Sequence, residues 1–140
     1  ISDHLHGTVN RFVNEYRMVQ LPNPPMEKLV EELSRNGYDL YLMSNTSRRF
    51  RKFSRYIKSV QYMKGIWISC EHGLLKPEPE AYLDFFRTFS LEPEECFFID
   101  DKPANIEAAG NLGMNGCVYY GDVRELRSFM RENGIKVSQE

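Results

Sequence analysis

The stretch Cys96-Phe97-Phe98-Ile99-Asp100-Asp101 decides the fold of this chain. Its first four residues form a short apolar run, which is typical of a strand buried on both faces of a parallel sheet. Two carboxylates follow where that strand would end, and open parallel sheets bind ligands at the carboxyl ends of their strands. Adjacent carboxylates repel each other unless a cation or hydrogen-bond donors lie between them. The pair therefore indicates a ligand site, with a solvated turn that caps the next helix as the alternative.

Strand-like and helix-like patterns alternate along most of the chain. Further strands are predicted at residues 38–43, 65–69 and 116–120. Amphipathic helices are predicted to begin near Met26, Arg48, Pro79, Pro103 and Val123. This alternation, without internal repeats or low-complexity segments, is typical of an α/β fold with a parallel, doubly wound sheet and flanking helices.

The first twenty residues carry a different pattern. Residues 3–20 place apolar side chains at steps of three and four, as on one stripe of an amphipathic helix. These side chains are Leu5, Val9, Phe12, Val13, Tyr16 and Val19. The stretch Leu21-Pro22-Asn23-Pro24-Pro25 then breaks the pattern, because proline removes backbone donors and disfavours helix in the residue before it. We interpret this stretch as a hinge or domain boundary.

Composition limits the classes of partner. The chain has 140 residues and a formal net charge of −2, so neither a nucleic-acid nor a membrane partner is expected. No apolar run approaches the roughly 20 residues that span a bilayer, and the first residues do not have the pattern of a signal peptide. Three widely spaced cysteines are interpreted as free thiols of a cytoplasmic protein: Cys70, Cys96 and Cys117. Five basic residues are interpreted as a solvated helix face rather than as an anion site: Arg48, Arg49, Arg51, Lys52 and Arg55.

Polar side chains follow the predicted strands. They are Ser44, Asn45 and Thr46 after the first, Lys76 in the loop beyond the second, and Asp100, Asp101 and Asn105 after the third. In a parallel sheet these loops meet at one edge. Hydroxyl and amide groups can donate to phosphate oxygens, an ammonium adds a positive charge, and carboxylates can hold Mg²⁺. The set indicates phosphoryl chemistry.

Each of these residues also has a simpler interpretation. Ser44 and Thr46 can be helix N-caps, Asn45 can be a turn residue, and Lys76 can be an ordinary surface charge. The coincidence of all of them at strand ends makes the simpler interpretations less probable in combination than singly. The three histidines make no convincing triad or metal site and are interpreted as incidental: His4, His6 and His72.

The motifs in combination resemble those of the haloacid dehalogenase (HAD) superfamily. Its second motif, a strand ending in Ser or Thr and then Asn, matches residues 40–46. Its third, a Lys-Pro that opens a helix, matches residues 76–80, and its fourth, an apolar strand ending in paired acids, matches residues 97–101. The resemblance covers about residues 22–130 and is nearest to sugar-phosphatase-like members and to the phosphatase-type domain of epoxide hydrolases.

The resemblance implies a role for each site residue. Ser44 and Asn45 would bind the transferring phosphoryl group, and Lys76 would neutralise it, so that Ser44 and Lys76 act in catalysis. Asp101 would be the direct Mg²⁺ ligand and Asp100 a second ligand or its partner. Thr46 and Asn105 would support the site in positions matched within the family. Paired acids favour magnesium-dependent phosphatase chemistry over dehalogenation in this family.

One departure from the family concerns its first motif, an aspartate nucleophile with a second aspartate two residues later. No Asp-x-Asp follows an apolar strand in this sequence. Residues 1–21 are therefore expected to be the C-terminal helix of a truncated helical cap. Residues 22–140 are expected to form a Rossmann-like HAD core that lacks its first, central strand, with a partner or swapped segment filling the gap.

Three hypotheses follow. The first is a fragment or processed form of a cytoplasmic Mg²⁺-dependent phosphatase that acts on a small phosphate monoester through an aspartyl-phosphate, and that is inactive as this chain alone. The second is a catalytically dead HAD-like domain used for binding or regulation. The third is a phospho-acceptor receiver domain, which is disfavoured because its acid pair follows the first strand and its lysine the last.

Overall fold

A computed structural model describes residues 8–15 and 23–139 of the chain. Five parallel strands form one sheet in the order β3-β2-β1-β4-β5. Their bounds are Arg11–Asn14 (β1), Asp39–Ser44 (β2), Met63–Ile68 (β3), Cys96–Asp100 (β4) and Asn115–Val118 (β5). The parallel α/β architecture predicted from the alternating patterns is confirmed.

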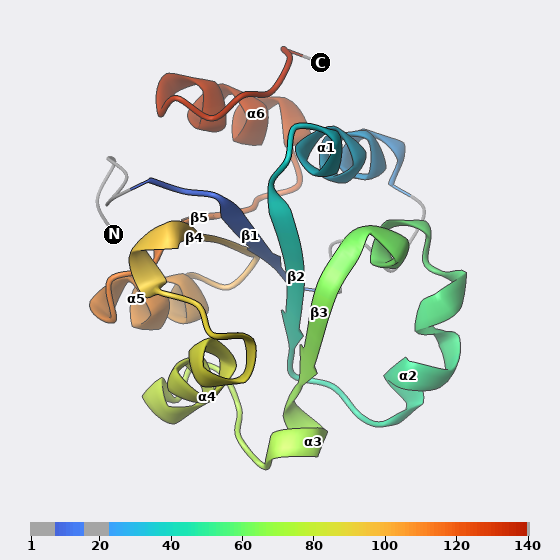
Figure 1. The fold of residues 1–140 in the computed structure, drawn as a ribbon, viewed down its shortest axis with the longest axis vertical. Coiled ribbons are helices and arrows are strands. Elements are labelled where there is room, and N and C mark those ends of the chain that lie inside the picture. The colour runs from blue at the N-terminus through green and yellow to red at the C-terminus, as the bar shows by residue number, and fades with distance from the viewer. Residues whose placement is uncertain (1–7, 16–22, 140) are drawn as a thin grey trace.

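Helices cover both faces of the sheet (Figure 1). They are α1 (Pro24–Arg35), α2 (Arg49–Phe53), α3 (Ser69–His72), α4 (Pro79–Phe89), α5 (Pro103–Asn111) and α6 (Val123–Glu132). Proline opens α1, α4 and α5, where its fixed φ suits the first turn and its missing N–H costs nothing. Helices α1 and α6 lie on one face, and α4 and α5 lie on the other.

The sheet separates two apolar cores. The core under α1 and α6 includes Phe12, Leu29, Leu40, Phe97 and Met130. The core under α4 and α5 includes Val13, Tyr41, Tyr82, Phe98 and Ile106. Neighbouring residues of a strand point to opposite faces, so that Phe12 enters the first core and Val13 the second. Phe12 and Val13 are both fully buried, and burial of such a side chain stabilises the fold by about 1.5–3 kcal/mol.

The helix predicted for residues 3–20 is wrong where the structure describes it. Residues Arg11–Asn14 form strand β1, which pairs in parallel with β2 on one side and β4 on the other. Phe12 and Val13 fit either a helical stripe or a buried strand, and a run this short cannot distinguish the two. The outcome is decided by tertiary context, because the inner edges of β2 and β4 offer two rows of backbone groups that need partners.

The expectation of a core without its central strand is corrected by the same observation. The place between β2 and β4 is filled by the chain's own residues 11–14, so neither a partner nor a swapped segment is needed there. Residues 1–7 and 16–22 lie outside the described residues. They include His4 and His6, most of the expected cap helix and the expected boundary near residue 21.

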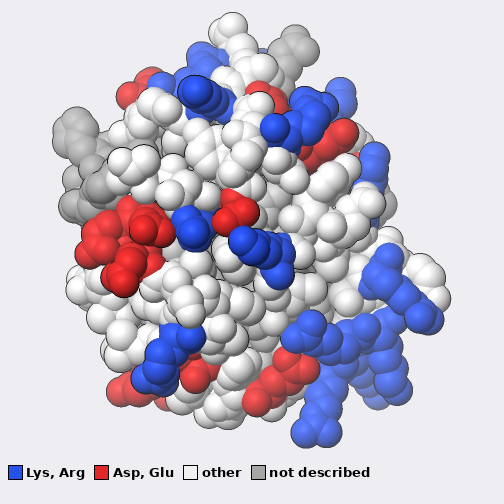
Figure 2. Space-filling view, in the orientation of Figure 1, with Lys and Arg blue, Asp and Glu red and all other residues white. Residues whose placement is uncertain are grey.

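The segment between β2 and β3 is less regular than the sequence suggested. Instead of one helix over 48–60, it contains α2 and two 3₁₀ turns, η2 (Ser54–Tyr56) and η3 (Lys58–Tyr62). Phe50 and Ile57 anchor it to the core. Figure 2 shows that Lys and Arg side chains gather over this segment, whereas a group of Asp and Glu side chains lies on the opposite side of the view.

Candidate active site

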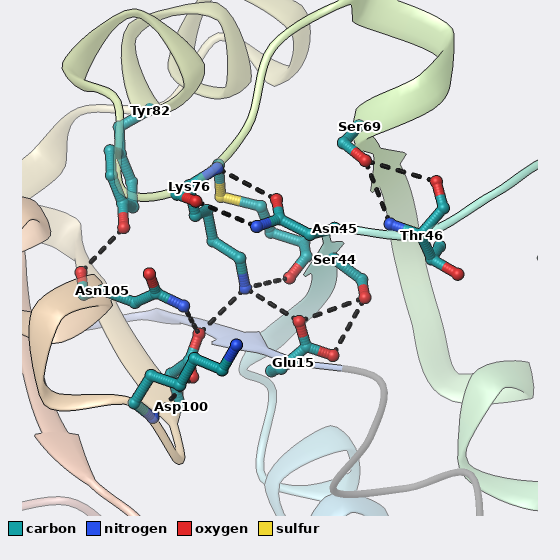
Figure 3. Close-up of polar contacts among 11 residues, drawn as sticks. Glu15, Ser44, Asn45, Thr46, Ser69, Lys76, Tyr82, Asp100 and Asn105 are labelled. Atoms are coloured by element: carbon teal, nitrogen blue, oxygen red, sulfur yellow. Dashed lines mark hydrogen bonds and ion pairs between the residues drawn. The ribbon is translucent and has the colours of Figure 1, made fainter.

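Four polar side chains meet where the central strands end (Figure 3). Ser44 is the last residue of β2 and Asp100 is the last residue of β4. Glu15 directly follows β1, and Lys76 comes from the loop between α3 and α4. All four are at most 3% exposed. The fold therefore gathers two carboxyl groups, an ammonium and a hydroxyl in one buried cluster at the carboxyl edge of the sheet.

The Lys76 ammonium lies at the centre of this cluster. Its Nζ is 3.0 Å from Glu15 Oε1 and 2.9 Å from Asp100 Oδ2, and it donates to the Met43 carbonyl at 2.9 Å. These three contacts use the three donors of an ammonium. Nζ also lies 5.1 Å from the centroid of the Phe98 ring. A buried charge is tolerated only when it is paired and hydrogen-bonded, and Lys76 meets both conditions.

Asp100 is held in its ionised form. Burial alone would raise the pKa of this carboxyl, but the Lys76 charge and hydrogen bonds outweigh burial and hold the pKa below its usual value. The hydrogen bonds come from Lys76, from the backbone N–H of Lys102 at 2.9 Å and from the Asn105 amide at 3.0 Å. The carboxylate is thus fixed in orientation as well as in charge.

Glu15 is the site residue that sequence reasoning missed. Its two carboxyl oxygens lie 3.1 and 2.9 Å from the Ser44 hydroxyl, and one of them also accepts from Lys76. The search for a nucleophile considered only aspartate, whereas here Asn14-Glu15 follows the apolar pair Phe12-Val13. An acid directly after a short apolar run was the signal that could have found it.

Asn45 and Thr46 stabilise the loops around the cluster. The Asn45 side chain donates to the Lys76 carbonyl and accepts from the Lys76 N–H, both at 2.9 Å, so it fixes the backbone that presents the lysine. The Thr46 backbone instead exchanges hydrogen bonds with the Ser69 hydroxyl, at 3.0 and 3.2 Å. Asn45 is exposed and therefore lies at the mouth of the site.

Asn105 is buried and reaches the cluster from α5. Its amide donates to Asp100, and its backbone carbonyl accepts a hydrogen bond of 2.8 Å from the Tyr82 hydroxyl. Burial raises the pKa of Tyr82 well above its usual value, and the nearby Asp100 charge adds to the shift, so the phenol remains a donor. Tyr82 of α4 thereby supports the first turn of α5.

The residues present fit a magnesium ion. Among the described residues, no three His, Cys, Asp or Glu side chains are grouped as a closed metal cage. In phosphoryl sites, however, Mg²⁺ usually has one or two carboxylate ligands, with water and substrate phosphate in the other positions. Asp100 and its exposed neighbour Asp101 offer such a pair. In the cluster one ammonium contacts two carboxyl groups, Glu15 and Asp100.

His72 lies with a different set of residues. Its Nδ1 is 2.7 Å from Asp84 Oδ2, and its ring stacks on Trp67 with centroids 4.8 Å apart. The Trp67 indole donates to the same carboxylate at 2.9 Å, and chiefly this hydrogen bond lowers the pKa of Asp84. These contacts join β3, α3 and α4, and we assign them a structural role.

Comparison with known proteins supports the resemblance found in the motifs. The family of haloacid dehalogenase-like hydrolases matches residues 3–113. The chain belongs to this family. The match extends through β1, so this strand and Glu15, which directly follows it, lie inside the region shared with other members.

Several curated relatives are phosphatases or related hydrolases. The chain is 29% identical over 113 residues to flavin mononucleotide hydrolase 1 of Arabidopsis thaliana, covering 81% of this chain and 46% of the relative. It is 30% identical over 96 residues to a sesquiterpene phosphatase of Aspergillus oryzae, covering 68% and 49%. It is also 28% identical to the D-ribitol-5-phosphate phosphatase of Bacteroides thetaiotaomicron, covering 76% and 49%. The chain thus spans about half the length of these relatives.

Solved structures with the same fold include members of this family. An HAD family enzyme from Bacteroides thetaiotaomicron, crystallised with magnesium and inorganic phosphate, superposes with a TM-score of 0.62 at 29% identity over 73% of this chain and 55% of that chain. A protein from Corynebacterium glutamicum superposes with a TM-score of 0.76 over 93% of this chain and 98% of that chain. At 19% identity the second comparison shows the fold alone.

Proposed function

We propose that this site is built for magnesium-dependent hydrolysis of small phosphate monoesters. The observation that carries the proposal is the position of Lys76, whose ammonium lies between the carboxyl group after β1 and the carboxylate at the end of β4. A fixed positive charge beside an attacking carboxylate would stabilise the negative charge of a transferring phosphoryl group. Relatives that are phosphatases, and one crystallised with magnesium and phosphate, support the same reaction class.

Each residue then has a defined task. Ser44 and Asn45 would donate to the phosphoryl oxygens, and Lys76 would balance their charge. Asp100 and Asp101 would hold Mg²⁺, which supplies charge stabilisation for the phosphoryl group when it is bound. Asn105 and the Lys102 N–H would keep Asp100 ionised and oriented. In the family mechanism a carboxylate attacks phosphorus, and water hydrolyses the resulting acyl phosphate.

The identity of residue 15 decides whether this site can turn over phosphate monoesters. Its carboxyl group stands after the central strand, on the lysine, as the family's nucleophile would, but the glutamate side chain is one methylene longer than aspartate. That length brings both oxygens against the Ser44 hydroxyl, which the phosphoryl group would need. We therefore propose that the chain with Glu15 turns over phosphate monoesters negligibly.

Replacing Glu15 with Asp tests this proposal. Removal of one methylene retracts the carboxylate by roughly one C–C bond, about 1.5 Å, and frees Ser44. With Mg²⁺ and a set of small phosphate monoesters, the Glu15→Asp chain should release phosphate at least about tenfold faster than the unaltered chain, which corresponds to about 1.4 kcal/mol in the barrier. The same variant should also be stabilised against thermal unfolding by inorganic phosphate with Mg²⁺.

Two matched variants serve as controls. Glu15→Gln keeps the length of the side chain but removes its charge and should gain no turnover, and Glu15→Asp combined with Asp101→Asn should lose the gain. If Glu15→Asp neither releases phosphate nor responds to phosphate and Mg²⁺ in thermal unfolding, the proposed phosphatase site is wrong.

A second candidate is a HAD-like domain that binds without turnover. The observation that favours it is the complete engagement of Glu15, which is 1% exposed and satisfies both Ser44 and Lys76 without any ligand. A stable complex with another protein, unaffected by Glu15→Gln and devoid of phosphatase activity even with Glu15→Asp, would favour this candidate.

A further inference from the structure

The segment between β2 and β3 carries an uneven share of the positive charge. Residues 48–64 contain seven Lys and Arg and no Asp or Glu. They are Arg48, Arg49, Arg51, Lys52, Arg55, Lys58 and Lys64. Since the chain has 18 basic and 20 acidic residues, the other residues hold 11 basic against 20 acidic. The small net charge, from which no membrane partner was expected, hides a basic segment on an otherwise acidic protein.

Most of this charge is not neutralised by neighbouring acids. Arg51 pairs with Glu71 at 2.8 Å, and Lys64 lies 3.4 Å from Asp39. The other five make no ion pair with any acid of the described residues, and all five are exposed. We call these five the basic surface: Arg48, Arg49, Lys52, Arg55 and Lys58. Figure 2 shows blue side chains protruding together over α2.

Two exposed aromatic rings lie among the basic side chains. Phe53 is 40% exposed and Tyr56 is 75% exposed. The Arg55 guanidinium lies 5.0 Å from the centroid of the Tyr56 ring and donates to its hydroxyl at 3.0 Å. Aromatic rings beside Lys and Arg are a combination that proteins place at the interface between lipid headgroups and acyl chains.

The segment that presents these side chains is anchored to the protein. Phe50 is fully buried and Ile57 is 8% exposed, and both pack in the core under α1 and α6. The backbone that carries the basic surface is therefore anchored before any partner binds, so that less backbone entropy is lost on binding.

We propose that the basic surface docks this chain on an anionic phospholipid membrane. The acidic remainder of the protein would repel a nucleic acid that wraps around it, whereas a flat membrane contacts one face only. None of the described helices is long and apolar enough to cross a bilayer, so the contact is peripheral. The basic surface begins two residues after Thr46, which follows β2 at the carboxyl edge of the sheet. The proposal does not depend on the proposed phosphatase activity.

Vesicle binding tests the proposal. The full chain is mixed with vesicles of phosphatidylcholine with phosphatidylserine, or of phosphatidylcholine alone, and bound protein is measured by sedimentation. Binding should require phosphatidylserine and weaken as salt is raised, because exposed charges are screened. Each basic residue near an anionic membrane raises affinity roughly fivefold, so replacing Arg48, Arg49, Lys52 and Arg55 with Gln should weaken binding at least about 100-fold.

A matched variant separates position from net charge. Replacing four exposed basic residues of α1 and α6 with Gln changes the net charge equally and should leave vesicle binding unchanged: Lys28, Arg35, Arg124 and Arg131. Tyr56→Ala should weaken binding several-fold, and Tyr120→Ala, at a ring that is 77% exposed elsewhere, should not. Circular dichroism establishes that each variant is folded.

Three outcomes would overturn the proposal. The first is no binding of the unaltered chain to phosphatidylserine vesicles. The second is equal loss in the two quadruple variants, which would make binding a matter of net charge alone. The third is tighter binding to a single-stranded oligouridylate than to the vesicles, which would assign the basic surface to nucleic acid.

Discussion

Two buried cations, Lys76 at the carboxyl edge of the sheet and Arg127 between α1 and α6, are held by opposite arrangements of charge. The side chains of Lys76 and Arg127 are 0% and 2% exposed. Lys76 faces two carboxyl groups, Glu15 and Asp100. Arg127 faces one, Glu32 at 2.6 Å, and its remaining contacts are the backbone carbonyl and hydroxyl of Ser138.

The Arg127–Glu32 pair between α1 and α6 joins one cation to one carboxylate. Burial opposes ionisation of Glu32, but hydrogen bonds from Arg127 and from Ser138 outweigh it and lower the pKa of this carboxyl. One positive and one negative charge tie the last residues of the chain to α1. In the Lys76 cluster the single ammonium contacts two carboxyl groups, Glu15 and Asp100, instead of one. The two arrangements therefore predict different responses when one partner of each cation is removed.

The largest expected effect is that of removing the Lys76 charge. Lys76→Met leaves Glu15 and Asp100 buried together without a cation, and breaking a buried pair in this way costs about 3–5 kcal/mol of unfolding free energy. Urea denaturation at neutral pH measures the loss. The control, Lys102→Met at an exposed position, should change stability by less than about 0.5 kcal/mol. A loss below about 1 kcal/mol for Lys76→Met would mean that the cluster is open to water.

The cost of Lys76→Met should shrink in acid. In the unaltered chain the pKa of Asp100 is below its usual value, so this carboxylate contributes stability that is present above the unfolded pKa of about 3.9 and is lost as pH falls through the lower folded pKa. Without Lys76 that contribution is absent. The two unfolding free energies should therefore converge below about pH 4, whereas a difference that persists there would assign the effect of Lys76 to packing.

The sequence predicts those parts of the site that directly follow apolar runs recognised as strands. Ser44 and Asp100 end apolar runs that become β2 and β4, as predicted. Lys76 was predicted from its place after β3 and lies within 2.9 Å of Asp100. The roles of these residues in binding phosphate and metal stay predictions.

The missed features all depend on contacts between distant parts of the chain. Strand β1 is four residues long, and its assignment depends on pairing with residues 39–42 and 96–99. Glu15 was missed together with that strand. The Arg127–Glu32 pair joins residues 95 apart, and Arg127 lies on an amphipathic helix where an exposed arginine is the ordinary expectation. Local periodicity carries no information about such pairs.

The smallest expected change in unfolding free energy is that caused by replacing both members of the Arg127–Glu32 pair. Arg127→Met alone leaves the Glu32 carboxylate without its cation and should lower the free energy of unfolding by about 3 kcal/mol or more. Arg127→Met combined with Glu32→Met replaces the pair by apolar side chains. The free energy of unfolding of this double variant should lie within about 1 kcal/mol of that of the unaltered chain. Urea denaturation of the single and double variants measures this recovery. The corresponding double variant at the site, Lys76→Met with Glu15→Met, should not recover its unfolding free energy, because Asp100 stays buried without its cation. If the two double variants recover equally, the stability of buried Asp100 does not depend on the Lys76 charge, and the two buried cations are held alike.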